Sequence, residues 1–160
     1  MRTTSNLLAA AGLCAFLAST PAGAMGPTND SPAASDYSKG VAAVESKDYA
    51  GAVKLLTGVI QQEPNNADAF TYLAFSLRMQ GKPEDSVRYY QRALAIKPDH
   101  ARAAEYLGEA YLTLKDLPKA EAQLATIERI CGTGCKEYAA LSGAIATYKR
   151  DPAAPRQKSG

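Results

Sequence analysis

Two cysteines, Cys131 and Cys135, stand close together near the end of the sequence, with Gly132 and Gly134 between them. In an oxidising compartment such a pair is most simply a disulfide, and glycines permit the tight backbone that so small a ring requires. A redox-active pair and a site for a thiophilic metal such as copper are the alternatives. Neither has supporting residues, because the spacing is not Cys-x2-Cys and no His or Met lies nearby in sequence. We therefore predict a structural disulfide and no metal site.

Few other residues have the types and spacing that catalysis needs. The one histidine, His100, follows Pro98 in an expected turn, where a histidine is usually solvated. Glu105 and Glu109 lie one helical turn apart, as an acid–base pair would, but Arg102 stands one turn earlier and would neutralise them. The sequence contains no glycine-rich phosphate loop, zinc-binding His pair or nucleophile elbow. We predict a protein that is not an enzyme and uses no cofactor.

The first 24 residues have the composition of a cleaved secretion signal. Arg2 precedes an apolar stretch over residues 7–18, and residues 22–24 supply the small-x-small pattern of a cleavage site. The stretch is too short to span a bilayer as a helix, which takes about 20 residues. Cys14 leaves lipid anchoring as an alternative, which the bulky Leu13 before it disfavours. We predict a periplasmic protein, or a secreted one as the alternative, with no transmembrane segment after signal removal.

Charge and composition exclude some partners and delimit the folded part. The formal net charge is only +2, and Lys and Arg are scattered rather than gathered into a stripe, so nucleic acid is not expected to bind. Residues 25–35 and 151–160 are rich in Pro, Ser, Gly, Asn and charge, which indicates a disordered linker and a disordered tail. One folded domain is expected between them, over residues 36–150.

The middle of the sequence repeats. Pro64 and Pro98 close two similar segments 34 residues apart, and the same register divides the chain into repeats over about 33–66, 67–100 and 101–134. In the second repeat Phe70, Leu73, Ala74 and Leu77 follow the i, i+3, i+4, i+7 spacing of one helix face. After the third repeat, residues 136–150 form an amphipathic pattern that is typical of a helix capping a stacked array.

These repeats resemble the tetratricopeptide repeat. The consensus positions of the second repeat hold Phe70, Leu73, Ala74, Leu77, Gly81, Ser86, Tyr90, Ala93 and Pro98. The third repeat matches in part, and the first matches only in its second helix, so its first helix is expected to fray. The resemblance implies an all-α fold, a short right-handed solenoid of about three helical hairpins plus a C-terminal capping helix.

The resemblance also implies that the concave surface, lined by the first helix of each repeat, binds a peptide or protein. By consensus position its residues would be Tyr37, Val41, Val44, Asp68, Thr71, Phe75, Arg78, Arg102, Glu105, Glu109 and Leu112. Some family members hold a chaperone's carboxyl terminus with a clamp of five polar residues, and among the corresponding positions only Arg102 could serve. A partner with an apolar anchor and some charge suits this groove better.

The sequence thus predicts an exported adaptor or scaffold that binds a partner in the groove. One alternative is a self-associating structural protein of the envelope, in which Tyr37, Val41 and Val44 stack against a second copy. The other is a redox or metal-handling protein that uses Cys131 and Cys135.

Overall fold

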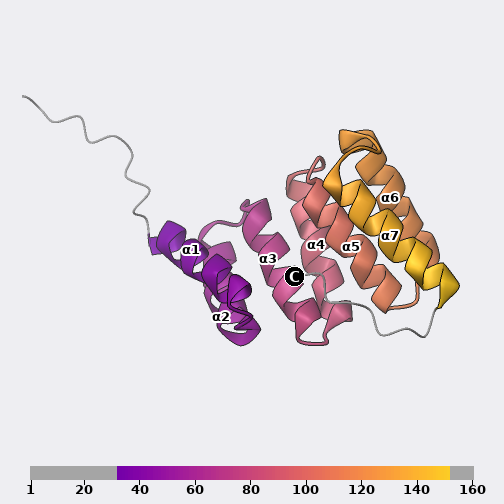
Figure 1. The fold of residues 1–160 in the computed structure, drawn as a ribbon. Helices are drawn as coiled ribbons and strands as arrows, with labels where there is room; N and C mark the ends of the chain where they lie inside the picture. Colours follow the sequence, from indigo (N-terminus) through magenta and orange to yellow (C-terminus); the bar gives the residue numbers. More distant parts are fainter. Residues whose placement is uncertain (1–31, 152–160) are drawn as a thin grey trace, which may run out of the picture.

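The computed structural model describes residues 32–151, and within them the chain forms seven α-helices and no strand (Figure 1). The helices are α1 (Pro32–Glu45), α2 (Tyr49–Gln62), α3 (Ala67–Met79), α4 (Pro83–Ile96), α5 (Ala101–Thr113), α6 (Leu117–Cys131) and α7 (Lys136–Arg150). The first six pair as three hairpins and α7 packs on α5 and α6, so the predicted stack with a capping helix is confirmed. The residues predicted to form a signal peptide, residues 25–31 of the predicted linker and residues 152–160 of the predicted tail lie outside the described residues.

The first helix begins earlier than the sequence indicated. The composition predicts a linker over residues 25–35, but residues 32–35 form the first turn of α1. Pro32 suits the first position of a helix, because its backbone needs no hydrogen-bond partner there and its φ angle is already helical. Ala33 is buried, which ties this turn to the domain. The folded region therefore starts before residue 36.

The turn inside each hairpin is built in the same way. Lys47, Gly81 and Lys115, spaced by one repeat, have positive φ angles of 64°, 79° and 62°. In each turn the backbone N–H of the following residue reaches back five residues, as Lys82 N–H does to the Leu77 carbonyl at 3.0 Å. This is the pattern that ends a helix with a left-handed residue, for which glycine is preferred. The first and third turns use lysine instead.

Glycines allow the helices to approach closely at both ends of the stack. A Cβ atom on Gly40 of α1 would lie 2.8 Å from the Leu56 side chain of α2. A Cβ atom on Gly108 of α5 would lie 2.5 Å from the Leu141 side chain of α7. Gly40 therefore explains why α1 packs despite its poor match to the repeat consensus, and Gly108 fixes α7 against the last hairpin.

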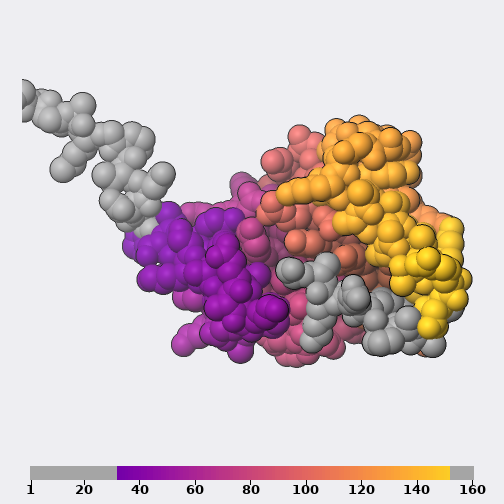
Figure 2. Space-filling view, in the orientation of Figure 1, coloured from indigo at the N-terminus to yellow at the C-terminus, as the bar shows by residue number. Residues whose placement is uncertain are grey.

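The stack has two layers. The first helices of the hairpins lie in sequence order, α1 beside α3, α3 beside α5 and α5 beside α7, while α2 and α4 also pack against the next hairpin. The first hairpin and α7 stand at opposite ends of the molecule (Figure 2). No helix within residues 32–151 is both long and apolar enough to cross a membrane. The layer of α1, α3, α5 and α7 positions the residues described next.

Candidate functional site

The predicted groove residues lie on α1, α3 and α5, and we call the surface of these helices together with the start of α7 the A-helix face. Their exposure differs widely. Asp68 is exposed, and Tyr37, Val41, Val44, Arg78, Arg102 and Glu109 are partly buried. Thr71, Phe75, Glu105 and Leu112 are buried. The face therefore consists largely of side chains that contact one another, and only part of it can contact a partner directly.

Phe75 lies on α3, the helix between α1 and α5, and it packs within the chain. Its ring centroid is 6.2 Å from that of Tyr49 and 5.0 Å from that of Tyr106. The Arg78 guanidinium lies 5.4 Å from the Phe75 ring centroid and 5.8 Å from that of Tyr106. Only 5 % of Phe75 is exposed, so it belongs to the core and is not a free anchor for a ligand. Leu112 and Thr71 are buried in the same way.

We divide the face into two halves by their residues. The N-terminal half holds Asp68, Thr71, Tyr72, His100 and Arg102, and the C-terminal half holds Arg78, Glu105, Glu109 and Glu137. Tyr72 and Arg102 join α3 to α5 in the N-terminal half. The Arg102 Nη1 donates a hydrogen bond to the Tyr72 hydroxyl at 3.0 Å. The Tyr37 ring meets the Tyr72 ring edge to face, with centroids 6.2 Å apart. Burial is the main cause that raises the pKa of Tyr37 to about 12, and the nearby Asp68 carboxylate adds to this shift. Tyr37 therefore packs against its own chain as a neutral ring.

His100 also belongs to the N-terminal half, and it is buried where the sequence indicated a solvated turn. Its Nε2 lies 3.1 Å from Asp68 Oδ1 and 3.3 Å from Thr71 Oγ1. The Thr71 hydroxyl donates to the Ala67 carbonyl, so it can only accept from the imidazole, and Nε2 carries the proton. Burial lowers the pKa of His100 although Asp68 opposes this shift. The histidine thus links two repeats through a donated hydrogen bond.

Arg78 and Glu109 form an ion pair across α3 and α5. The Arg78 Nη2 and the Glu109 Oε2 are 2.7 Å apart, and the two side chains are only 9 % and 11 % exposed. Burial alone would lower the pKa of Arg78, but Tyr90 and Glu109 outweigh it and raise that pKa. A pair this well shielded holds the two helices together only while both partners are present.

Glu105, one turn before Glu109, has no such partner. Only 9 % of the residue is exposed, and no hydrogen bond or ion pair joins its carboxylate to any residue of the described chain. Arg102, expected to neutralise both glutamates, instead donates to Tyr72. Burial first, then the carboxylates of Glu109 and Glu137, raise the pKa of Glu105 to about 7. A carboxyl group without a hydrogen-bonding or ion-pair partner within residues 32–151 therefore lies in the C-terminal half of the face.

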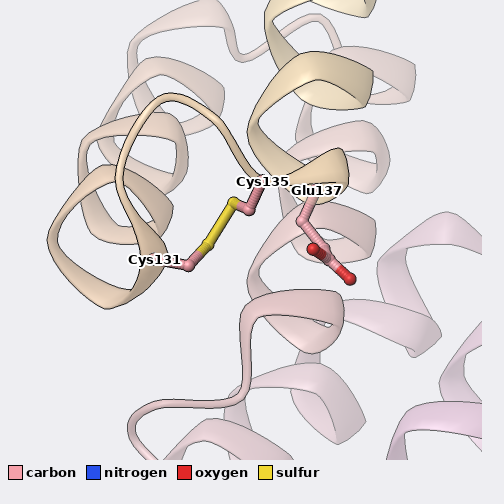
Figure 3. Close-up of side chains that lie close together, drawn as sticks. All are labelled: Cys131, Cys135 and Glu137. Carbon is pink, nitrogen blue, oxygen red and sulfur yellow. A yellow bond between two sulfur atoms is a disulfide. The ribbon is translucent and has the colours of Figure 1, made fainter.

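Cys131 and Cys135 form a disulfide that joins the end of α6 to the residue before α7 (Figure 3). Figure 3 shows the Glu137 side chain next to this bridge. The two sulfurs and a Glu137 carboxylate oxygen all lie within 4.8 Å of one another. The three atoms are suitable ligands for a thiophilic metal, but in the disulfide the sulfurs are bonded to each other and are not thiolates. The bridge fixes the start of α7, and with it the position of Glu137.

Three residues that contribute to the site were absent from the predicted groove, namely Tyr72, Tyr106 and Glu137. Tyr72 and Tyr106 are spaced by one repeat on α3 and α5, and both stand at positions that correspond to the family's chaperone-tail clamp, which was the available signal. Glu137 had no such signal, because α7 lies outside the three repeats and only the packing of α7 on α5 brings it near Glu105.

The sequence matches a family model described as Tetratricopeptide repeat, over residues 37–98 and again over 73–133. A relative from Xenopus laevis, Tetratricopeptide repeat protein 37, is 27% identical over 93 residues, which are 54% of this chain and 6% of that protein. The chain thus spans a small part of that relative.

Two solved structures share the fold. The Yersinia enterocolitica type III secretion translocator chaperone SycD has a TM-score of 0.67 and 18% identity, covering 72% of this chain and 82% of that one. The second tetratricopeptide repeat domain of human RPAP3, solved in complex with the HSP70 peptide SGPTIEEVD, has a TM-score of 0.66 and 20% identity, covering 71% of this chain and 94% of that one.

Proposed function

Because the chain belongs to the tetratricopeptide repeat family, we propose that it is a non-enzymatic interaction module that holds a peptide or protein segment on the A-helix face. The observation that carries the proposal is the row of partly accessible rings and charges on α3 and α5. Asp68 is exposed, and Tyr72, Arg102 and Tyr106 on the same two helices are partly buried. Aromatic rings next to fixed charges give both contact area and orientation to a bound segment.

The two structural neighbours support this use of the fold. SycD is a chaperone of secretion translocators, and the RPAP3 domain binds a peptide of HSP70. An extended peptide laid along α3 and α5 would meet side chains from two repeats, so its affinity would depend on the spacing between helices rather than on one pocket. The secretion signal predicted over residues 1–24 supports an adaptor or scaffold that binds its partner in the periplasm.

The test is a selection of random peptides on the purified protein, repeated with a variant of the face. Asp68→Arg reverses an exposed charge in the first turn of α3, while Asp85→Arg makes the same change in the first turn of α4 and is the matched control. We expect the first variant to lose affinity for the selected peptides by about tenfold, which is about 1.4 kcal/mol, and the control to keep it. Circular dichroism checks that both remain helical.

Two results would contradict the proposal. Peptides that bind both variants as tightly as the unaltered protein would place binding elsewhere, and a selection without enrichment would remove peptide binding as the function. Self-association has less support than groove binding, because Tyr37 packs on Tyr72 and Val44 packs on the core within one chain. Light scattering across a dilution series measures it directly.

A second candidate function rests on the cluster of Cys131, Cys135 and Glu137. A dithiol reductant would transfer two electrons to the bridge and become a disulfide itself, leaving two thiols. These would release their protons to water as their sulfurs bind a Zn²⁺ or Cu⁺ ion. Counting thiols in protein taken from its own compartment tests this function. A bridge that is always closed there would exclude it.

A further inference from the structure

We propose that the C-terminal half of the A-helix face recognises a Lys or Arg side chain of the bound segment, with Glu105 and Glu137 as its acceptors. This inference rests on the proposed function and names the chemistry of the partner. It follows from the charges that surround one buried carboxylate.

The first step concerns the groups that face Glu105. They are Glu109 on the same helix, Glu137 on α7, Arg102 on the same helix and Arg78 on α3. Both arginines have partners already, since Arg78 pairs with Glu109 and Arg102 donates to Tyr72. The Glu105 carboxylate is therefore left next to two other carboxylates without a direct cationic partner in the described chain.

The second step concerns Glu137, the other proposed acceptor. Its side chain is 14% exposed, and its neighbour in ion pairing is Lys136 at 3.9 Å, whose own side chain is 80% exposed. An ion pair this long, to a side chain this exposed, contributes little to stability. Both acceptors are largely buried, so a cation that reached Glu105 and Glu137 together would interact with them more strongly than in water and would relieve the repulsion between them.

The third step distinguishes a side-chain cation from a bare metal ion. A metal needs its ligand atoms within a few ångströms of one another, and in the part of the chain described only Cys131, Cys135 and Glu137 meet that condition. Glu105 and Glu109 do not join them. An ammonium or guanidinium group on a flexible stem can reach acceptors that are farther apart, and the partly buried Tyr106 ring offers its stem an apolar contact.

The proposed partner has the opposite charge to that of the human neighbour. The peptide in the RPAP3 complex, SGPTIEEVD, carries three acidic residues. In this protein the C-terminal half of the A-helix face holds three carboxylates, those of Glu105, Glu109 and Glu137. Arg78 neutralises one of them, that of Glu109. A basic segment fits this surface and an acidic one is repelled by it.

Binding of a cation must also depend on pH. The pKa of Glu105 is raised to about 7 by burial and by Glu109 and Glu137, with Arg102 and Arg78 opposing. A Lys or Arg side chain binds the ionised carboxylate, so the protein must release the proton of Glu105 on binding below that pH. Affinity should therefore rise between about pH 6 and about pH 8 and change little above it.

The experiment uses the peptides selected on the full chain. We expect them to be enriched in Lys or Arg, and we replace the enriched residue with norleucine, which keeps the stem and removes the charge. In the unaltered protein this replacement should weaken binding by about tenfold or more, and in Glu105→Gln by less than about twofold, because the charged acceptor is gone. Glu128→Gln, on the exposed side of α6, is the matched control and should behave as the unaltered protein.

The outcomes separate this inference from the proposed function. Peptides without a basic residue that still depend on Asp68 would overturn the cation site and leave groove binding intact. An equal effect of norleucine in the unaltered protein and in both Glu105→Gln and Glu137→Gln would also overturn it. If no peptide is enriched, groove binding fails and the inference fails with it.

Discussion

The two halves of the A-helix face differ in whether their charged side chains have partners. In the N-terminal half, the exposed Asp68 accepts from His100 and Arg102 donates to Tyr72, so each charged or polar group has a partner from the neighbouring repeat. In the C-terminal half, three carboxylates meet and one arginine, Arg78, pairs with Glu109. Glu105 has no cationic partner among the described residues.

This difference shows which half is suited to stability and which to recognition. A satisfied polar network fixes the angle between repeats and offers little to a ligand. A buried carboxylate without a partner destabilises the fold. This loss of stability is offset only when a ligand supplies a positive charge next to the carboxylate. The predictions below change one half at a time, and they run from the largest expected effect to the smallest.

Removing the one arginine of the C-terminal half should have the largest effect. Arg78→Met removes the arginine that pairs with the almost buried Glu109 carboxylate, and we expect the free energy of unfolding to fall by about 3–5 kcal/mol. Urea unfolding near pH 8 measures this. The double variant Arg78→Met with Glu109→Gln should recover much of the loss, since no buried charge is then left alone. A loss below about 1 kcal/mol in the single variant would show that the pair is not shielded.

Displacing α7 from α5 should weaken the crowding of carboxylates. In Gly108→Ala the new Cβ atom would lie 2.5 Å from Leu141, and we expect a loss of about 1–3 kcal/mol of unfolding free energy from overpacking. Gly143→Ala, on α7 with nothing within 4 Å, is the control and should gain about 0.5–1 kcal/mol. If Glu137 moves away with α7, the pKa of Glu105 should fall toward its ordinary value, which NMR titration detects.

Neutralising Glu105 should stabilise the protein at alkaline pH. Its pKa rises from 4.5 in an ordinary glutamate to about 7 in the fold, so the folded protein retains a proton that the unfolded chain releases between these values. The unfolding free energy of the unaltered protein should therefore fall as the pH rises from about 5 to about 8, by about 1–2 kcal/mol.

Glu105→Gln carries no charge at this position and should lose that pH dependence. Near pH 8 it should unfold at higher urea concentration than the unaltered protein, and near pH 5 the two should be similar. Glu128→Gln, which changes an exposed glutamate, is the control. A parallel pH dependence in all three proteins would mean that Glu105 is ordinarily solvated.

The architecture could be predicted from the sequence because it is determined by the pattern of the repeats. Spacings such as Pro64 to Pro98, and the apolar face from Phe70 to Leu77, determine three hairpins through local periodicity. The consensus of the family also located Arg78 and Glu109 on neighbouring helices.

What the sequence could not supply is which side chains meet across repeats. Arg102 is one turn from Glu105 in the sequence, and local spacing favoured an ion pair between them. Instead the Arg102 guanidinium donates a hydrogen bond to the hydroxyl of Tyr72 on α3. His100 was expected in solvent for the same reason, since Asp68 and Thr71 approach it only after α3 and α5 pack. Which side chains form hydrogen bonds across repeats depends on the three-dimensional packing of the helices. The period of the repeats does not predict that packing in enough detail.

The smallest effect is expected from the carboxylate of the N-terminal half, and it should have the opposite sign. Asp68→Asn makes the same carboxyl-to-carboxamide change as Glu105→Gln, but its side chain is 54% exposed and accepts from His100, so we expect a loss of only about 0.5 kcal/mol. Asp68 opposes the burial that lowers the pKa of His100. Without Asp68 that pKa should fall further, so the folded state retains the imidazolium even less well and the loss should grow below about pH 6. Proton NMR titration of the one histidine and urea unfolding measure the two effects. If Asp68→Asn stabilised the protein as Glu105→Gln should, the N-terminal half would hold an unsatisfied charge of its own, and the distinction between the halves would be lost.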